Sequence, residues 1–164
     1  MERQMVVTQR DCPARLVPAG TKISIPKDTF VTITQALGGN YTVSVNGNLA
    51  RIDGTDAGAI GMKAQAFDFN APEDGSIDED QVWQALKTIF DPEIPVNVVD
   101  LGLIYSVNIN SVEGGGYKVD ADLTLTAPGC GMGPVIAEDC RQRILKMPAV
   151  SDAPPVPRTP RLAV

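Results

Sequence analysis

The sequence predicts an α+β protein: a small N-terminal β-meander unit followed by a compact α-β-β-α domain. The first sixty or so residues are rich in β-branched segments with glycine turns, and two amphipathic helical patterns come later, flanking two strand-like runs. We therefore expect an N-terminal β-rich domain at residues 1–66, a linker at 67–75, a second domain at 76–150 and a disordered proline-rich tail at 151–164.

Short strands separated by turn residues make up the first domain. Strands are predicted at Thr21–Ile25, Val31–Thr34, Tyr41–Val45 and Leu49–Ile52. Asn46-Gly47, between the last two, is the strongest short signal for a β-hairpin. The segment 53–58 that follows is rich in Asp and Gly but lacks the spacing of a calcium loop, so we interpret it as a solvated turn.

The second domain begins with a helix and ends with another. Residues 76–79 fit a capping box, and the helix after them places apolar side chains on one face: Val82, Leu86, Ile89 and Phe90, with Trp83 beside them as an expected core residue. Strands are expected at 103–109 and 117–125, joined by the glycines at 114–116. The last helix begins at Pro134, and its apolar face carries Ile136, Cys140, Ile144 and Met147.

The composition excludes several classes of function. The net charge of −6 without a basic cluster argues against nucleic-acid binding, and no apolar run or signal peptide suggests a membrane or an export route, so we expect a cytoplasmic protein. The chain has no histidine, which rules out Ser-His-Asp and Cys-His nucleophiles and histidine-based zinc sites. Its three cysteines are too few for a Cys₄ site, and no nucleotide-binding glycine motif is present.

One stretch, Leu123 to Pro134, is the best candidate for chemistry. It is a strand end, a glycine-rich loop and a helix start, with Cys130 in the loop. A helix N-terminus stabilises a thiolate, and the glycines around Cys130 allow backbone N–H groups to face an anion. The alternative interpretation of the same features is a tight turn with Cys130 as a small filler. Cys140 is expected in the core, and Cys12 is expected to be a surface thiol.

Three carboxylates precede that loop in the sequence: Asp91 and Glu93 in a rigid proline turn, and Asp100 shortly after it. They either shape helix ends and turns or form a polar wall beside Cys130. Both readings remain open from the residues alone.

Two long segments resemble a known family. Residues 91–105, DPEIPVNVVDLGLIY, and residues 123–130, LTLTAPGC, closely resemble the iron–sulfur carrier and assembly domain family, once called a domain of unknown function. Residues 32–39 and 41–49 are similar to its SufT branch, so the resemblance covers about residues 5 to 150. It implies that Cys130 is the functional thiol, with a site wall that consists of Asp91, Pro92, Glu93, Thr126, Pro128 and Gly129.

The resemblance implies assembly or delivery of iron–sulfur clusters to client proteins, not turnover of a metabolite by an enzyme. Clusters usually need four protein ligands, and this motif supplies one thiol. We therefore expect Cys130 to hold iron or a cluster transiently, shared across a homodimer or with a scaffold or client protein. Two alternatives stay open: a thiol-dependent redox protein using Cys130, with Cys12 or Cys140 as resolving thiol, and a binding module without chemistry.

The end of the chain departs from the family pattern. The family domain continues after the second helix into another strand, whereas Val150 is followed here by a proline-rich segment. We therefore expect the third strand of the second domain to be missing, with its exposed sheet edge covered by the N-terminal unit or by a partner strand, or left as a marginal core.

Overall fold

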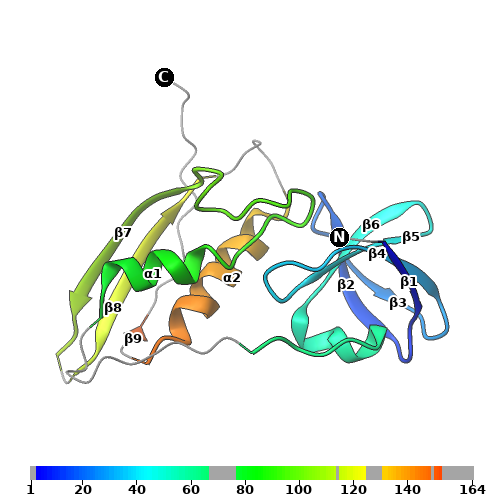
Figure 1. Cartoon of the computed structure of the whole chain (residues 1–164), viewed down its shortest axis with the longest axis horizontal. Coiled ribbons are helices and arrows are strands. Elements are labelled where there is room, and N and C mark those ends of the chain that lie inside the picture. Colours follow the sequence, from blue (N-terminus) through cyan, green and yellow to red (C-terminus); the bar gives the residue numbers. More distant parts are fainter. Residues whose placement is uncertain (1–2, 67–76, 114, 125–130, 149, 153–164) are drawn as a thin grey trace. The chain divides into compact units, whose positions relative to one another are not determined.

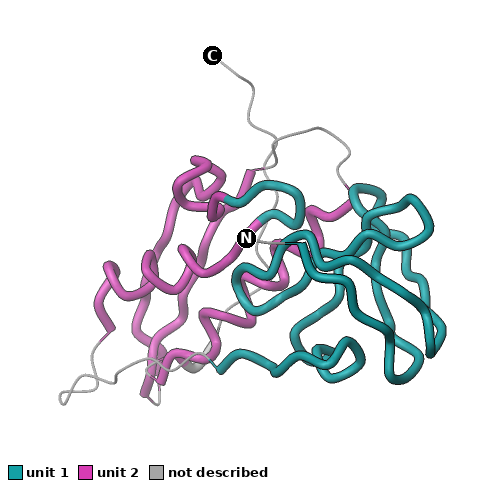
Figure 2. The backbone as a smooth tube through the Cα atoms, turned by 45° about the vertical axis from the view of Figure 1, so that its right-hand side comes forward, with its two compact units in different colours: residues 1–66, 91–95 teal, residues 67–90, 96–164 magenta. Residues whose placement is uncertain are grey.

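The chain folds into two compact units in the computed structural model, which describes residues 3–66, 77–113, 115–124, 131–148 and 150–152. Unit 1 comprises residues 1–66 and 91–95, and unit 2 comprises residues 67–90 and 96–164 (Figure 2). The described strands and helices confirm the predicted α+β class. The predicted linker at 67–75 lies outside the described residues.

Unit 1 is a six-stranded antiparallel sheet in the order β1-β4-β5-β6-β2-β3 (Figure 1). Its strands are β1 (Gln4–Val7), β2 (Cys12–Val17), β3 (Lys22–Ile25), β4 (Phe30–Gln35), β5 (Tyr41–Val45) and β6 (Asn48–Ile52), followed by the 3₁₀ helix η1 (Gly54–Ile60). The four predicted strands are present, and β4-β5-β6 form the expected meander. Strands β1 and β2 were not predicted, so the sheet is wider than expected.

The β5–β6 hairpin confirms the strongest turn signal. Asn46 has φ 49° and Gly47 has φ 79°, the two positive values that a tight type I′ turn requires. The segment after β6 is more ordered than the expected solvated turn, because the Asp53 carboxylate caps η1 by accepting a hydrogen bond from Thr55 N at 3.1 Å.

The core of unit 1 lies on one face of the sheet, where Val31, Ile33, Val43 and Ile52 are buried with Ile60 of η1. Cys12 is in this core with none of its surface exposed, so the prediction of a surface thiol is wrong. The physical reason is the strand period: Cys12 begins β2 on the same face as Ala14, which is also buried.

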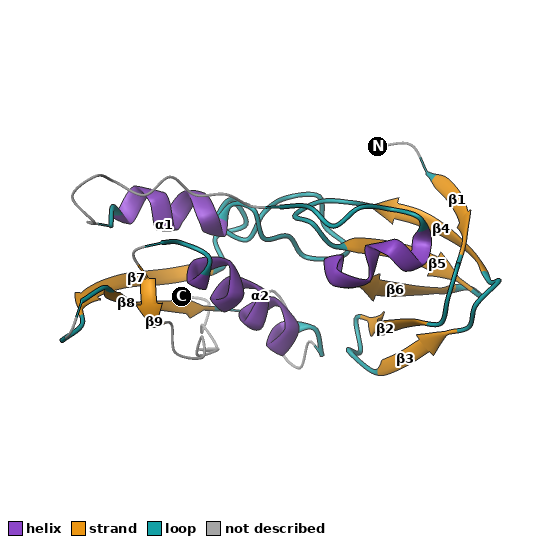
Figure 3. Cartoon of the chain, turned by 90° about the horizontal axis from the view of Figure 1, so that it is seen from below, coloured by secondary structure: helices purple, strands orange, loops and turns teal. Residues whose placement is uncertain are grey.

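Unit 2 combines two helices with a three-stranded sheet in the order β7-β8-β9 (Figure 3). Its elements are α1 (Glu79–Leu86), β7 (Ile104–Ser111), β8 (Tyr117–Leu123), α2 (Gly133–Leu145) and β9 (Val150–Asp152). The helices contact each other, α1 also contacts β7, and α2 contacts β9. Within the described ranges, neither helix has the length and apolarity needed to cross a bilayer.

The expected loss of the third strand is wrong. β9 pairs in parallel with β8, with Tyr117 opposite Val150 and Lys118 opposite Asp152. Helix α2 returns the chain to the start of β8, so a short segment after the helix is enough to add a parallel strand. Residues 151–152 therefore belong to the sheet and not to the predicted tail, whose remainder, 153–164, lies outside the described residues.

Helix α1 ends at Leu86, so Ile89 and Phe90 of its predicted apolar face lie beyond the helix, Ile89 buried and Phe90 half-buried. The cap of α1 is Asp78, whose carboxylate accepts from Asp80 N at 3.0 Å; Ser76, the expected capping residue, is outside the described residues. The predicted apolar face of α2 is buried in full. Trp83 is only half-buried, because its indole N–H donates to the Glu79 carboxylate one turn earlier at 3.2 Å and holds the ring at the surface.

One polar residue in the core of unit 2 was not expected. Arg143 of α2 is buried, and its guanidinium donates to Thr88 Oγ1. Thr88 Oγ1 in turn donates to Ala85 O at 2.6 Å, which joins α2 to the end of α1. Burial lowers the pKa of Arg143, and nearby Asp139 opposes this shift.

Candidate functional site

The Asp91-Pro92-Glu93 turn is held in shape by its own first residue. Asp91 Oδ1 accepts a hydrogen bond from Glu93 N at 2.9 Å, the bond that defines an Asx turn. Pro92 fixes its own backbone φ and is buried, whereas Glu93 is exposed. One carboxylate thus maintains the turn and the other faces solvent.

Two neutral side chains of the sheet bind the backbone of this turn within unit 1. Gln35 Nε2 donates to Asp91 O at 2.9 Å, and Thr42 Oγ1 donates to Pro92 O at 2.6 Å in a buried environment. Gln35 and Thr42 are paired across β4 and β5, so they approach the turn from adjacent strands. Among the described residues no hydrogen bond or ion pair involves the Glu93 carboxylate, so the anchored turn leaves that group available.

A second acidic turn, in unit 2, is closed by local hydrogen bonds. Asn97 Oδ1 accepts from Val99 N at 3.0 Å and from Asp100 N at 2.9 Å. Asn97 Nδ2 donates back to Asp100 Oδ2 at 2.7 Å. Asp100 is exposed, but its carboxylate is already engaged with Asn97, which favours a turn-forming role for it.

The Asn97–Asp100 turn leads into β7, which pairs with β8, the strand that precedes the Cys130 loop in the sequence. Leu103 N donates to Val98 O at 3.0 Å, and Thr124 N donates to Leu103 O at 2.7 Å. Thr124 is buried and is the last described residue before Cys130 in the sequence. The residue just before the loop is therefore held in unit 2 by a backbone hydrogen bond between Thr124 and Leu103.

The other side of the loop is the start of α2. Met132 is the N-cap and is buried, but among the described residues no side chain caps the helix, and no acidic residue lies in its first turn. Pro134 occupies the first turn, as predicted. The helix thus begins three residues after Cys130 in the sequence, and its first turn contains no carboxylate to offset the positive end of its dipole.

The predicted site residues fall into two groups. Asp91, Pro92 and Glu93 form one turn, which belongs to unit 1. Thr126, Pro128, Gly129 and Cys130 lie outside the described residues, so their assignment as site wall and functional thiol stays a prediction. Sequence reasoning missed Gln35 and Thr42, and no local signal in the sequence marks them, because they lie 56 and 50 residues from the groups they bind.

The two other cysteines are held as neutral thiols. Burial, with a smaller contribution from Asp56, raises the pKa of Cys12, while Arg10 opposes the shift. Burial and Asp139 raise the pKa of Cys140 to about 12, against an opposing effect of Arg143. Since the thiolate is the nucleophile and the metal ligand, neither thiol is suited to either role in the folded chain.

These features define an α+β protein in which the β-sheet unit holds the Asp91-Pro92-Glu93 turn and the second unit holds the segment that contains Cys130. The profile of a family described as "Iron-sulfur cluster assembly protein" matches residues 79–153. The SufT Fe-S protein maturation auxiliary factor of Staphylococcus aureus is 38% identical over 64 residues, which cover 39% of this chain and 68% of that protein. The chain belongs to this family of iron–sulfur cluster assembly proteins.

Two further relatives carry the same description. An Fe-S protein maturation auxiliary factor of Porphyromonas gingivalis is 46% identical over 66 residues, which cover 40% of this chain and 59% of that protein. The factor YitW of Bacillus subtilis is 32% identical over 74 residues, 45% of this chain and 69% of that protein. The matched segment thus spans about three fifths to two thirds of the length of these relatives.

Proposed function

We propose that this chain is a cytoplasmic maturation factor that assembles iron–sulfur clusters or delivers them to client proteins through the thiol of Cys130. The observation that carries the proposal is family membership over a segment that contains both the Asp91-Pro92-Glu93 turn and Cys130. The cluster is cargo, and the chain is a carrier and not an enzyme that turns over a metabolite.

The distribution of thiols supports Cys130 as the point of attachment. The chain has no histidine and three cysteines, and Cys12 and Cys140 are both fully buried with raised pKa values. Cys130 is therefore the remaining thiol, at a sequence position where the dipole of α2 favours a thiolate. One thiolate does not satisfy a cluster, so the other ligands come from a second copy, a scaffold or a client.

The same burial argues against a thiol–disulfide cycle. Such a cycle needs a resolving thiolate that reaches the first sulfur, and both candidates are enclosed in the cores of their units. Opening a core to expose Cys12 or Cys140 would require local unfolding. The iron–sulfur proposal needs no such step.

The test is complementation of cells that depend on this protein for the activity of cluster-containing enzymes. Cys130→Ala is expected to abolish maturation, whereas Cys140→Ala, which removes one buried sulfur, is expected to retain it. Anaerobic incubation of both variants with iron and sulfide, followed by visible absorption, reports cluster retention directly. Full complementation by Cys130→Ala, at wild-type protein abundance, would overturn the role of this thiol.

A further inference from the structure

A row of five polar side chains crosses the sheet of unit 1. The strand registers place Lys22 opposite Arg15, Arg15 opposite Arg51, Arg51 opposite Thr42, and Thr42 opposite Gln35. Directly paired residues of antiparallel strands project from the same face. The chain neighbours Ala14 and Ala50 belong to the core, so the row occupies the opposite face.

The row has two chemically different halves. Thr42 and Gln35 are neutral and bind the backbone of the Asp91–Pro95 turn. Lys22, Arg15 and Arg51 are cationic and form two consecutive like-charge pairs on adjacent strands, an arrangement that destabilises a sheet. Three adjacent cations are also unexpected in a chain with 14 basic and 20 acidic residues. A cost of this kind is commonly retained where it serves binding.

Of the three cations in the row, Arg51 has a nearby carboxylate as an ion-pair partner, whereas Arg15 and Lys22 do not among the described residues. Asp53 Oδ2 lies 3.9 Å from Arg51 Nη2, and Asp56 is engaged by Arg10 at 3.1 Å. Within the ranges that the structure describes, no ion pair involves Arg15 or Lys22. The Arg15 guanidinium is oriented by its hydrogen bond to Gly20 O at 3.1 Å.

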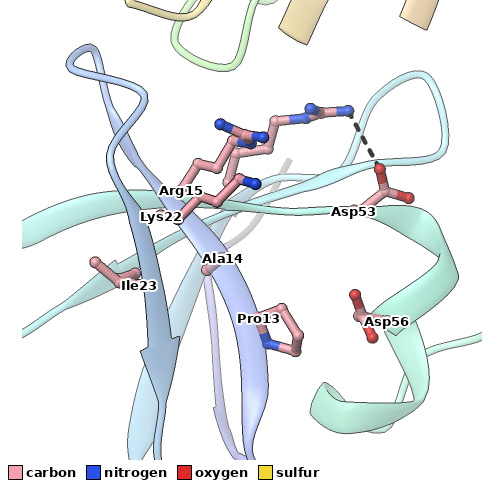
Figure 4. A pocket seen from close by; sticks show the side chains of 8 residues that line it. Pro13, Ala14, Arg15, Lys22, Ile23, Asp53 and Asp56 are labelled. Atoms are coloured by element: carbon pink, nitrogen blue, oxygen red, sulfur yellow. Dashed lines mark ion pairs between the residues drawn. The ribbon is translucent and has the colours of Figure 1, made fainter. Parts of the chain in front are cut away.

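The three cations line one pocket of about 290 Å³. Pro13 and Ile23 add apolar surface, and Asp53 and Asp56 lie toward η1 while Arg15 and Lys22 lie beside each other (Figure 4). The volume is at the small end of the roughly 300–1,000 Å³ typical of ligand pockets, which suits a compact group. The planar guanidinium fork of Arg15 and the ammonium of Lys22 match the oxygens of a tetrahedral oxyanion, and Arg51 adds positive charge to the pocket.

We propose that the pocket formed by Arg15, Lys22 and Arg51 binds a phosphate-type oxyanion, either inorganic phosphate or the phosphate of a small monoester. The anion offsets the repulsion along the row by charge-assisted hydrogen bonds. It lies beside Thr42 in the same row, and therefore beside the residue that anchors the Asp91–Pro95 turn. The pocket is formed by residues of unit 1, and this proposal does not depend on the proposed function.

The direct test titrates the full-length ¹⁵N-labelled chain with inorganic phosphate at constant ionic strength, made up with chloride. Saturable shifts are expected at amides of β2, β3 and β6. Lys22→Gln and Arg15→Gln are each expected to weaken binding about tenfold or more, the loss of one charge-assisted contact. The matched control is Lys27→Gln, an exposed lysine of the same unit outside the row, which should bind as the wild type does.

A parallel titration with glycerol 3-phosphate identifies the source of the oxyanion. Tighter binding than inorganic phosphate assigns the site to monoesters, and equal or weaker binding assigns it to the free ion. The proposal is overturned if phosphate gives no saturable shifts beyond those of chloride. It is equally overturned if Arg15→Gln and Lys22→Gln both bind with wild-type affinity.

Thermal unfolding supplies a second test, because Lys22→Gln should not lower the melting temperature without phosphate but should reduce the gain in melting temperature that phosphate causes. Without phosphate, Lys22→Gln is expected to melt at or above the wild-type temperature, because it removes a like-charge pair. With phosphate at about ten times its dissociation constant, the wild type should gain about 5 °C and the variant much less. An equal gain in both proteins would contradict binding by the cationic row.

Discussion

Each unit of this protein contains an acidic turn and a buried cysteine, but the two units hold their turns by different means. The Asp91–Pro95 turn of unit 1 is bound by Gln35 and Thr42, which are remote in sequence. The Asn97–Asp100 turn of unit 2 is closed by Asn97, two and three residues away from its partners. The first turn therefore depends on a folded sheet, whereas the second is encoded locally.

The buried cysteines show a parallel difference. Cys12 is the first residue of β2 and lies in the core of unit 1, and its pKa is raised by burial and by Asp56 of η1. Cys140 lies on the buried face of α2 in unit 2, where burial is the main cause that raises its pKa to about 12. Residue type alone therefore does not set these properties. Burial and neighbouring charges set the pKa of each cysteine, and the hydrogen-bond partners of each turn decide whether it depends on the folded sheet.

The largest expected effect concerns Cys140 at alkaline pH. Its folded pKa of about 12 lies above the ordinary thiol value of 9.0, so the folded state retains a proton that the unfolded state loses. The associated stability is fully present below pH 9 and is lost as pH rises toward 12. The free energy of unfolding should fall by about 1.4 kcal/mol per pH unit in that window from this group alone.

Urea unfolding followed by the fluorescence of Trp83, the single tryptophan and a residue of unit 2, measures this slope. Cys140→Ala is the matched comparison, because it keeps every other group that titrates above pH 9. The slope of the wild type should exceed that of the variant. Identical slopes would show that Cys140 titrates at its ordinary value in the folded chain.

The next effect concerns the anchor of the Asp91–Pro95 turn. Thr42→Val keeps the side-chain volume but removes the hydroxyl that donates to Pro92 O, leaving a buried carbonyl without its partner. A loss of about 1–3 kcal/mol is expected in the opening free energy of this region. Native-state amide hydrogen exchange at Glu93, Ile94 and the strands β4 and β5 provides the measurement.

Thr42→Ser is the control for this prediction, because serine retains the donor and loses one methyl group. It should preserve protection at Glu93 and Ile94 better than valine does. Equal protection in the wild type and in Thr42→Val would mean that the turn is held by its own Asx bond and not by the sheet.

The smallest effect is expected at Asn97. Asn97→Ala removes the acceptor for two backbone N–H groups of a half-buried turn, and should destabilise unit 2 by about 1 kcal/mol, as the loss of a helix cap does. The urea midpoint from Trp83 fluorescence measures it. The exchanged pair Asn97→Asp with Asp100→Asn keeps an acceptor at 97 and a donor at 100, and should recover most of the loss.

The sequence predicted those elements whose signals are local. The Asn46-Gly47 hairpin, the glycine reversal before β8 and the buried face of α2 all follow from residue type and period. Strand β2 was missed because Pro13 argues against a strand, although Pro13 pairs only with β3 and lies beyond the part of β2 that faces β6. β1 was missed because Met5 and Val7 are exposed on an edge and give no alternation of apolar and polar residues.

The third strand of unit 2 was also missed, for a different reason. β9 is three residues long and precedes a proline-rich segment, so no periodicity could reveal it. Its strand conformation comes from pairing with β8 after α2 has reversed the chain. Likewise, sequence reasoning found the Asp91-Pro92-Glu93 turn but not the side chains that bind it.

By itself, the sequence determined the α+β class, the family and the local turns. It also determined that the motif supplies one thiol, too few ligands for a cluster. Each of these depends on residue type or short spacing. The tertiary structure alone decided that Cys12 is buried, that Gln35 and Thr42 bind the Asp91–Pro95 turn, and that three cations are neighbours. These facts follow from strand register, which joins residues tens of positions apart and leaves no mark in any short window of sequence.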